Sequence, residues 1–202
     1  MTIRTLKVAA IVLAAGRSSR MSPRNKLLEL VDGTPVIAHV VDTALRSGAD
    51  AVIVVTGFEP SRLEEAVRGL NVTIVHNAFY EQGLSATLAI GLEALPSNID
   101  GALILLGDMP KIKSKDLRAL IAAFAARDGQ GICVPVRHGK RGNPVLWGAC
   151  YFAEMMALSG DVGAKQLLAR HAEKVLEVPV SSDGIFVDVD TTADIERLQT
   201  KR

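Results

Sequence analysis

The chain has 202 residues, of which 49% are hydrophobic and 22% charged, and its formal net charge is +1. This balance is typical of a soluble globular protein with a sizeable core, and it excludes bulk electrostatic attraction to nucleic acid or to an anionic membrane. Aromatic residues make up only 4% of the chain, which argues against a base-stacking platform for single-stranded nucleic acid.

Short β-branched runs alternate with longer amphipathic stretches along the first two thirds of the chain. Near-continuous apolar strands of this kind are buried on both faces, as in a parallel sheet covered by helices. The first predicted helix has Thr34 as its N-cap, Pro35 at its first position and Gly48 at its end. We expect strands over 7–14, 51–57, 72–77 and 101–108, and helices over 34–48, 60–70, 85–95 and 114–129.

The pattern changes after Gly131. Two apolar runs flank the basic, glycine-containing turn HGKRG, which predicts a hairpin or a short antiparallel excursion. We expect strands over 132–137, 143–148, 174–180 and 184–190, and helices over 151–160, 163–171 and 191–199. The whole chain, residues 1–202, is interpreted as one α/β domain whose mostly parallel sheet carries an antiparallel insertion in its second half.

The opening MTIRTLKVAAIVLAAG places basic residues before an apolar run, as a secretory signal does. The run is short, however, basic residues follow it, and the alternating pattern needs it as the first strand. No run of about 18 apolar residues occurs, so no transmembrane helix is expected. Cys133 and Cys150 lack CxxC spacing and are interpreted as small core residues of a reducing compartment. The expected location is the cytoplasm.

The loop after the first strand, LAAGRSSRMSPRNK, carries a concentration of positive charge. Residues 14–16 lack bulky side chains, so backbone N–H groups can approach a ligand closely. Arg17, Arg20 and Lys26 add charges suited to phosphate oxygens. The loop is not a Walker loop, because Met21 stands where GxxxxGK needs glycine, and the chain has no GxGxxG. A solvated basic loop is the alternative to an anion site.

Carboxylates follow two other apolar segments. Asp108, in LILLGDMP, ends a predicted strand, where a carboxylate can hold a hard cation such as Mg²⁺ or serve as a turn or cap residue. Asp188 and Asp190 alternate with valine in VDVDTT, so they share a face if the strand persists. Either one could complete a metal site, while the other, or Asp194 after Thr191, could cap the last helix.

The chain shows no HExxH motif, no GxSxG elbow and no Cys–His pairing, so nothing in it signals covalent catalysis. A positive loop together with isolated carboxylates instead predicts phosphoryl or nucleotidyl transfer. Such a reaction proceeds by positioning and electrostatic stabilisation, without a nucleophile from the protein.

Five motifs in order carry a resemblance to a known family: LAAGRSSRM with Lys26, GDMP, RGNPVLW, GDVGAKQLL and VDVDTTADI. Together they resemble the molybdenum cofactor cytidylyltransferases, of the MobA-like NTP transferase family, over about residues 7–198. The first motif alone is shared by nucleotidyltransferases that act on sugar, glycerol and isoprenoid phosphates. The resemblance implies a three-layer Rossmann-like nucleotidyltransferase fold and Mg²⁺-dependent transfer from CTP to molybdopterin, with release of pyrophosphate.

The resemblance also implies roles for individual residues. Arg20 and Lys26 would bind phosphates and stabilise the departing pyrophosphate, and Asp108 would be catalytic as a Mg²⁺ ligand, with Asp190 as a second ligand. The nucleotide would lie against Ala14, Ala15, Gly16, Lys26, Asn77, Gly83 and Ser85. The acceptor side would include Gly142, Asn143, Pro144, Asp161 and Gly163, for which turn chemistry is an equal alternative.

Three departures from the family pattern weaken the substrate assignment more than the fold. Ser22 replaces a common glycine, Met109 stands in Asp-Met-Pro where glutamine is often found, and Thr192-Ala193 replaces Pro and an acidic residue. The methyl group of Ala15 would narrow the base pocket, which favours cytosine over guanine. The alternatives are a guanylyltransferase or sugar-phosphate nucleotidyltransferase of the same fold, or a non-catalytic molybdopterin carrier. The family further implies transient contact with a molybdenum hydroxylase; no nucleic-acid or membrane partner is expected.

Overall fold

The computed structural model describes residues 5–18, 21, 23–160 and 164–200. Its centre is an eight-stranded sheet in the order β10-β7-β9-β6-β1-β4-β5, with β8 paired to β7. The strands are β1 (Val8–Ala14), β4 (Ala51–Thr56), β5 (Thr73–His76), β6 (Gly101–Leu106), β7 (Ile132–Arg137), β8 (Lys140–Arg141), β9 (Val145–Gly148) and β10 (Val175–Pro179).

The sheet is mixed in the way that the sequence predicts. Strand β1 is parallel to β4 and β6, and β5 continues the parallel set beside β4. Strand β9 runs antiparallel between β6 and β7, while β10 is parallel to β7. The expected α/β class, with a mostly parallel sheet and an antiparallel insertion in the second half, is confirmed.

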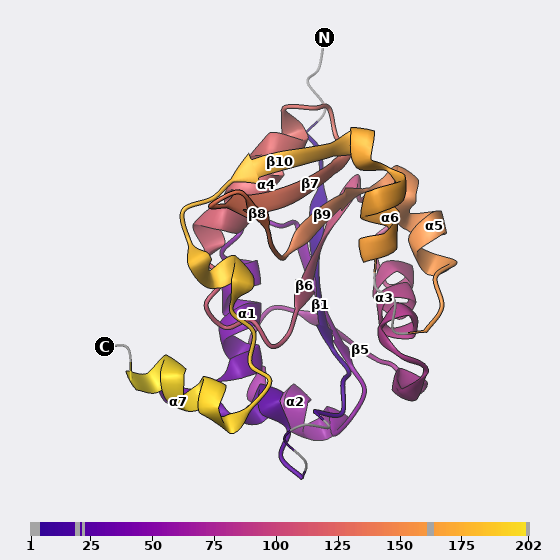
Figure 1. The fold of residues 1–202 in the computed structure, drawn as a ribbon. Helices are drawn as coiled ribbons and strands as arrows, with labels where there is room; N and C mark the ends of the chain where they lie inside the picture. The colour runs from indigo at the N-terminus through magenta and orange to yellow at the C-terminus, as the bar shows by residue number, and fades with distance from the viewer. Residues whose placement is uncertain (1–4, 19–20, 22, 161–163, 201–202) are drawn as a thin grey trace.

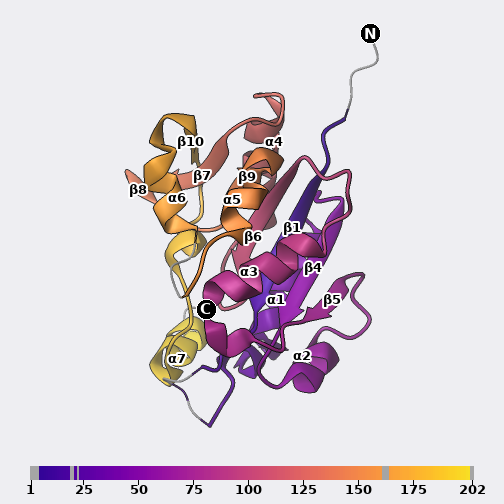
Figure 2. The same ribbon diagram turned by 90° about the vertical axis from the view of Figure 1, so that its right-hand side faces the viewer.

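Helices cover both faces of the sheet, which gives three layers. Figure 1 views the sheet nearly edge on, with α1 and α4 to its left and α3, α5 and α6 to its right; Figure 2 shows α3 lying across the second face. Within the described residues, no helix is both long and apolar enough to cross a membrane. The helices are α1 (Val36–Leu45), α2 (Pro60–Ala66), α3 (Leu84–Glu93), α4 (Ser114–Ala125), α5 (Phe152–Met156), α6 (Lys165–Arg170) and α7 (Thr192–Thr200).

Strand β1 lies in the middle of the sheet and is buried along its whole length. Because successive side chains point to opposite faces, Ala10 and Val12 join the core formed with α1, α2 and α4, whereas Ile11 and Leu13 join the core formed with α3 and α5. This two-sided packing explains why its sequence, VAAIVLA, has no polar position. It also fixes the place where the basic loop leaves the sheet.

The helix predicted over 34–48 begins later than expected, and Thr34 is not its N-cap. Residues Thr34–Pro35 form β3, which pairs antiparallel with β2 (Leu30–Val31), and α1 begins at Val36 without a side-chain cap. Asp32 and Gly33 between them have φ of 51° and 79°. A two-residue hairpin turn of the Asp-Gly type requires positive φ at both central residues. The Asp-Gly pair therefore favours a hairpin here and delays the start of the helix.

Two further expectations were wrong. The strand predicted over 184–190 is replaced by a 3₁₀ turn at Asp183–Phe186, followed by residues 187–190 that pair with no strand of the described sheet. Cys133 is buried as expected, whereas Cys150 is exposed. The segment 187–190 bonds to the loop after β6 instead of to a sheet edge: the N–H of Val189 donates to the carbonyl of Asp108 at 2.9 Å.

Gly91 of α3 marks the closest packing of a helix on β1. A Cβ atom at this position would lie 2.6 Å from Cγ2 of Ile11, a fully buried side chain, and 3.1 Å from Cγ2 of Val55. We expect Gly91→Ala to lower the free energy of unfolding by about 1–3 kcal/mol, because overpacking a dense core outweighs the roughly 1 kcal/mol that alanine gains in helix propensity. Urea denaturation followed by circular dichroism measures this change.

The control is a double-mutant cycle with Ile11→Ala, which removes the obstructing Cγ2. In that background Gly91→Ala should cost less than in the wild-type protein, since the two positions share one contact. Strictly additive effects would show that the Gly91–Ile11 approach is not the reason for the cost.

Candidate functional site

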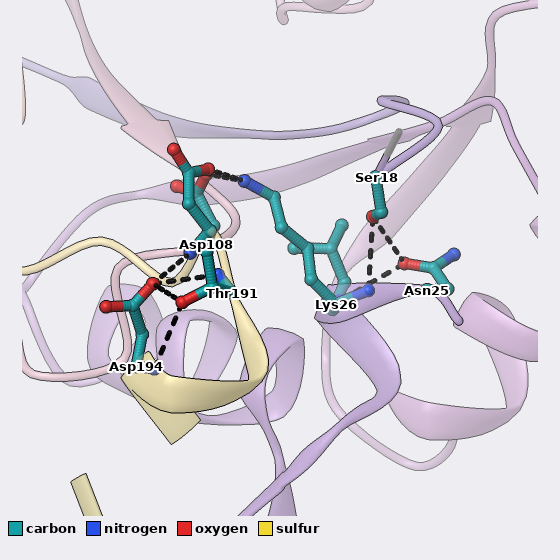
Figure 3. Close-up of polar contacts among 8 residues, drawn as sticks. Ser18, Asn25, Lys26, Asp108, Thr191 and Asp194 are labelled. Carbon is teal, nitrogen blue, oxygen red and sulfur yellow. Dashed lines mark hydrogen bonds and ion pairs between the residues drawn. The ribbon is translucent and has the colours of Figure 1, made fainter. Parts of the chain in front are cut away.

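Short polar side chains hold the loop that follows β1. Asn25, which is 2% exposed, caps a 3₁₀ turn, η2 (Lys26–Leu28), by accepting a hydrogen bond from the N–H of Leu27 at 3.1 Å. The N–H of Lys26 donates to Oγ of Ser18 at 3.1 Å. These bonds fix the backbone of Lys26, so its side chain leaves the loop from a defined point (Figure 3).

The side chain of Lys26 lies between two carboxylates. Its Nζ donates to Oδ2 of Asp108 at 2.6 Å and to Oδ1 of Asp190 at 2.8 Å, and Figure 3 shows the lysine reaching toward Asp108. The side chains of Lys26 and Asp108 are each 18% exposed and that of Asp190 is 35% exposed, so little water separates the three charges. Three groups from distant parts of the sequence therefore form one charged centre.

Asp108 reaches this centre because β6 ends close against β1. The N–H of Gly107 donates to the carbonyl of Leu13 at 3.0 Å. A Cβ atom on residue 107 would lie 2.9 Å from that carbonyl oxygen, so a side chain there would push the two strand ends apart. Glycine before Asp108 thus lets the carboxylate stand next to the loop that begins at Ala14.

Asp190 is held in place by the start of α7. Oδ2 of Asp194 accepts hydrogen bonds from the N–H of Asp190 at 3.1 Å, from the N–H of Thr191 at 2.7 Å and from the hydroxyl of Thr191 at 2.7 Å. The N–H of Asp194 in turn donates to the Thr191 hydroxyl oxygen at 3.3 Å. This reciprocal pattern is a capping box, and it assigns the cap to Thr191 and Asp194. Asp188 is exposed.

The charges at this centre favour the ionised lysine. Burial by itself lowers the pKa of Lys26, but the charges and hydrogen bonds of Asp108 and Asp190 outweigh burial, so this pKa lies above its ordinary value. With both carboxylates ionised, the three groups carry a net charge of −1. That surplus of negative charge, in a place with little water, suits a small cation.

The donor set at this centre also suits a hard divalent cation. Oδ1 of Asp108 is buried and has no hydrogen-bond partner among the described residues, so this acceptor is left unsatisfied. Among the described residues, no group of three or more His, Cys, Asp and Glu side chains is gathered to hold a metal. Mg²⁺ is commonly bound by only one or two carboxylates, the remaining ligands being water and substrate phosphate. Asp108 and Asp190 fit that arrangement.

A cavity of about 440 Å³ lies beside the charged centre. Its walls come from the loop after β1, the end of β6 and the start of α3, so it occupies the carboxyl edge of the parallel strands. The lining residues include Ala15, Gly16, Lys26, Gly83, Thr87 and Asp108. Part of the cavity wall therefore consists of small residues, and another part carries the charges of Lys26 and Asp108. Such a site can receive a phosphorylated ligand.

A second cavity, of about 590 Å³, adjoins the first and shares Leu13, Leu84 and Leu106 with it. Most of its wall is apolar and comes from α3, β6, β9 and α6. Polar groups are few, and they include Arg141, Asn143 and Lys165. Two ligands, one in each cavity, could thus meet near the charged centre.

The structure brings together many of the predicted residues but not all of them. Ala15, Gly16, Lys26, Gly83 and Asp108 line the first cavity, and Gly142 and Asn143 line the second. Ala14 and Pro144 are buried next to these walls. Asn77 and Ser85 are buried as well and bond within the protein: Asn77 Nδ2 donates to Thr87 Oγ1 at 3.1 Å, and Ser85 Oγ to the carbonyl of Gly160 at 2.7 Å. Arg20, Ser22, Asp161 and Gly163 lie outside the described residues.

Sequence reasoning missed several residues at these cavities. Glu81 was not expected at the first cavity, where it forms an exposed ion pair at 2.6 Å with Arg17, a residue that the sequence did single out. Arg141 and Lys165 line the second cavity. The signal was present for the last two, since they lie inside the motifs RGNPVLW and GDVGAKQLL. No pattern in the sequence pointed to Glu81, because its pairing depends on how η3 (Tyr80–Gln82) is placed against the loop after β1.

Comparisons with known proteins agree with this geometry. The family described as "MobA-like NTP transferase domain" matches residues 10–175. The structure of Rv0371c from Mycobacterium tuberculosis H37Rv superposes with a TM-score of 0.83 at 27% identity, covering 97% of this chain and 99% of that one. Rv0371c has also been solved in complex with manganese, with a TM-score of 0.82 at 26% identity, over 97% of this chain and 100% of that one.

Two other relatives extend the comparison. A nucleotidyl transferase from Methanothermobacter thermautotroptrophicus has a TM-score of 0.82 at 28% identity, over 96% of each chain. The bifunctional protein GlmU of Psychrobacter sp. (strain PRwf-1) is 33% identical over 114 residues, which is 56% of this chain but only 25% of GlmU. This chain thus spans about a quarter of the length of the curated relative that it matches.

The capping box makes stability depend on pH through Asp194. The hydrogen bond from the Thr191 hydroxyl, helped by the N–H groups of Asp190 and Thr191, lowers the pKa of Asp194 below its ordinary value of 3.8 despite partial burial. The carboxylate therefore stabilises the fold fully above about pH 3.8, and this contribution is lost as the pH falls through the lower folded-state pKa.

We expect Asp194→Asn to cost about 1 kcal/mol at pH 7, the scale of a helix cap. The difference in melting temperature between the wild-type protein and the variant should narrow as the pH falls below 3.8. Thermal denaturation between pH 7 and pH 2.5 checks this. Two parallel curves would mean that the ionised form of Asp194 is not what the cap requires.

Proposed function

Because the chain belongs to the MobA-like NTP transferase family, we propose that it transfers the cytidylyl group of CTP to molybdopterin and uses Mg²⁺. The products would be molybdopterin cytosine dinucleotide and pyrophosphate. The observation that carries the proposal is the position of Lys26, Asp108 and Asp190 beside a cavity that adjoins a second, mostly apolar cavity. A nucleotidyl transfer needs two substrates to meet beside cationic and metal-binding groups, and this arrangement supports that chemistry.

In this proposal the first cavity receives CTP. The backbone at Ala15 and Gly16 lies against the nucleotide, and Lys26 neutralises negative charge on its phosphates. A phosphate oxygen of the acceptor forms a bond to the α-phosphorus, and the bond from that phosphorus to the bridging oxygen of the β-phosphate breaks. The electron pair leaves with pyrophosphate, whose charge Lys26 stabilises.

Asp108 and Asp190 would hold the Mg²⁺ ion in this scheme. When bound, the ion supplies positive charge that offsets the charge on phosphate oxygens during transfer. The buried, unbonded Oδ1 of Asp108 supports this assignment, as does the contact between Asp190 and Lys26, which brings the second carboxylate to the same place. Arg20 remains a proposed phosphate ligand on the strength of its motif.

The mostly apolar wall of the second cavity favours an acceptor with a flat face that can pack against it. Trp147, Leu88 and Val134 contribute to its wall, whereas a site for a sugar would need many hydrogen-bonding groups for the hydroxyls. Arg141 and Lys165 place positive charge at the same cavity, as an acceptor that carries a phosphate would require. Molybdopterin meets both conditions, because the faces of its fused ring system can stack on apolar side chains and the molecule carries a terminal phosphate. We also propose that the product passes to a molybdenum hydroxylase in the cytoplasm.

A pyrophosphate-release assay with Mg²⁺ and molybdopterin tests the proposal when CTP, GTP, UTP and ATP are compared. We expect release that requires molybdopterin and is fastest with CTP. Release with a sugar phosphate, but none with molybdopterin, would move the assignment to a sugar-phosphate nucleotidyltransferase. No release with any nucleotide, from folded protein that still binds molybdopterin, would favour a carrier.

Ala15 provides a variant for the same assay. Its methyl group lies in the wall of the first cavity and would narrow the space for a purine. In Ala15→Gly the ratio of GTP to CTP use should therefore rise. An unchanged ratio would mean that the base is selected by another part of the wall.

The catalytic roles of Lys26 and Asp108 give a second prediction. We expect Lys26→Ala and Asp108→Ala each to lower kcat by about 10²–10³-fold or more, because the first removes a positive charge from the place where phosphate charge develops and the second removes a proposed Mg²⁺ ligand. Circular dichroism should show that both variants fold. Lys115→Gln, an exposed charge change on the first turn of α4, is the matched control and should keep wild-type activity. Full activity in a folded Lys26→Ala or Asp108→Ala protein would contradict the assignment.

A further inference from the structure

The ammonium group of Lys26 occupies the space between the two carboxylates that would hold the metal. Its contacts of 2.6 Å to Asp108 Oδ2 and 2.8 Å to Asp190 Oδ1 are both direct. A divalent cation that bridges the two carboxylates needs the same space, because it must come within about 2.0–2.1 Å of an oxygen of each, and the ammonium group already lies between them. The lysine and the metal therefore compete for one position.

We propose that Lys26 is a built-in counter-ion that metal binding displaces toward the phosphates of the nucleotide. This inference rests on the proposed nucleotidyl transfer and deepens it, because it links the two binding events. Without metal, Lys26 neutralises the carboxylates. With metal, it moves into the adjoining cavity, whose wall it already forms, and there it meets phosphate oxygens.

The backbone around Lys26 allows the side chain to move while the loop stays in place. The N–H of Lys26 is bonded to Ser18, and Asn25 caps the turn that Lys26 begins, so neither bond involves the ammonium group. The lysine side chain is long and flexible, so its charged end can move between several rotamers. Displacement therefore costs two ion-pair contacts and requires no refolding of the loop.

Coupling between the two ligands follows from this competition. In the absence of nucleotide, the metal binds against the cost of releasing Lys26 from its carboxylates. When a triphosphate is present, the released ammonium gains phosphate partners, which offset that cost. The coupling is reciprocal, so the metal tightens triphosphate binding by the same factor. The metal and the triphosphate therefore bind more tightly together than either does alone. In the absence of nucleotide the metal binds weakly.

Mn²⁺ binding, measured by electron paramagnetic resonance on Lys26→Met, tests the proposal without any reference to turnover. Methionine keeps the length and apolar stem of lysine but cannot neutralise the carboxylates. In the absence of nucleotide, we expect Lys26→Met to bind Mn²⁺ about tenfold or more tightly than the wild-type protein, the scale of one charge-assisted hydrogen bond. Lys115→Gln, the matched loss of one positive charge at an exposed position, should bind Mn²⁺ as the wild-type protein does.

The same titrations with CTP present give the coupling. CTP should tighten Mn²⁺ binding in both proteins, because its phosphates ligate the metal, but by a smaller factor in Lys26→Met. Equal or weaker Mn²⁺ binding by Lys26→Met without nucleotide would overturn the proposal. If the variant binds Mn²⁺ more tightly but the wild-type protein releases no pyrophosphate with any nucleotide, the counter-ion role stands and only the proposed reaction is wrong.

A measurement on the wild-type protein guards against misfolding of the variant. The Nζ signals of ¹⁵N-labelled lysine report the surroundings of the ammonium group, and Lys26→Arg identifies the Lys26 signal by its absence. Titration with Mg²⁺ alone should shift this signal. If Mg²⁺ displaces bound Mn²⁺ from the site while the Lys26 signal stays unchanged, the metal does not displace the lysine and the proposal fails.

Discussion

The close approach of two strand ends is the constraint on which the rest of the site depends. Gly107 bonds to the carbonyl of Leu13 and leaves no room for a side chain between β6 and β1. Asp108 consequently stands beside the loop that carries Lys26. The central position of β1, packed on both faces by apolar side chains, keeps this junction fixed, because neither strand can move without disturbing both cores.

The charged centre is then completed from the far end of the chain. The N–H of Val189 bonds to the carbonyl of Asp108, and the capping box of α7 sets the backbone at Asp190. In each case the backbone of a charged partner of Lys26 is held: the carbonyl of Asp108 by the N–H of Val189, and the N–H of Asp190 by the carboxylate of Asp194. The geometry of the three charges thus comes from ordinary strand and helix-terminus chemistry, and this explains how groups 82 and 164 residues apart from Lys26 meet within hydrogen-bond distance.

Much of the fold could be predicted because its signals are local. The apolar runs of β1, β4 and β6 and the periodic stretches between them indicate buried strands and covering helices. The turn HGKRG predicts the antiparallel excursion. The errors came where local signals competed. The Asp32-Gly33 turn took Thr34–Pro35 into a hairpin. The alternation in VDVDTT looked like a strand, but residues 187–190 pair with no strand of the described sheet.

The sequence by itself determined the fold class and the basic loop, and it named Lys26, Asp108 and the pair Asp188 and Asp190 as candidates, because each depends on residue type and on position relative to a strand end. Only the tertiary structure decided that Lys26 bridges both carboxylates, that Asp188 is exposed, and that Asn77 and Ser85 are buried and bond within the protein. The reason is physical: contacts such as that between Lys26 and Asp108, 82 residues apart, depend on packing and on backbone bonds between loops, and neither leaves a periodic signal in the chain.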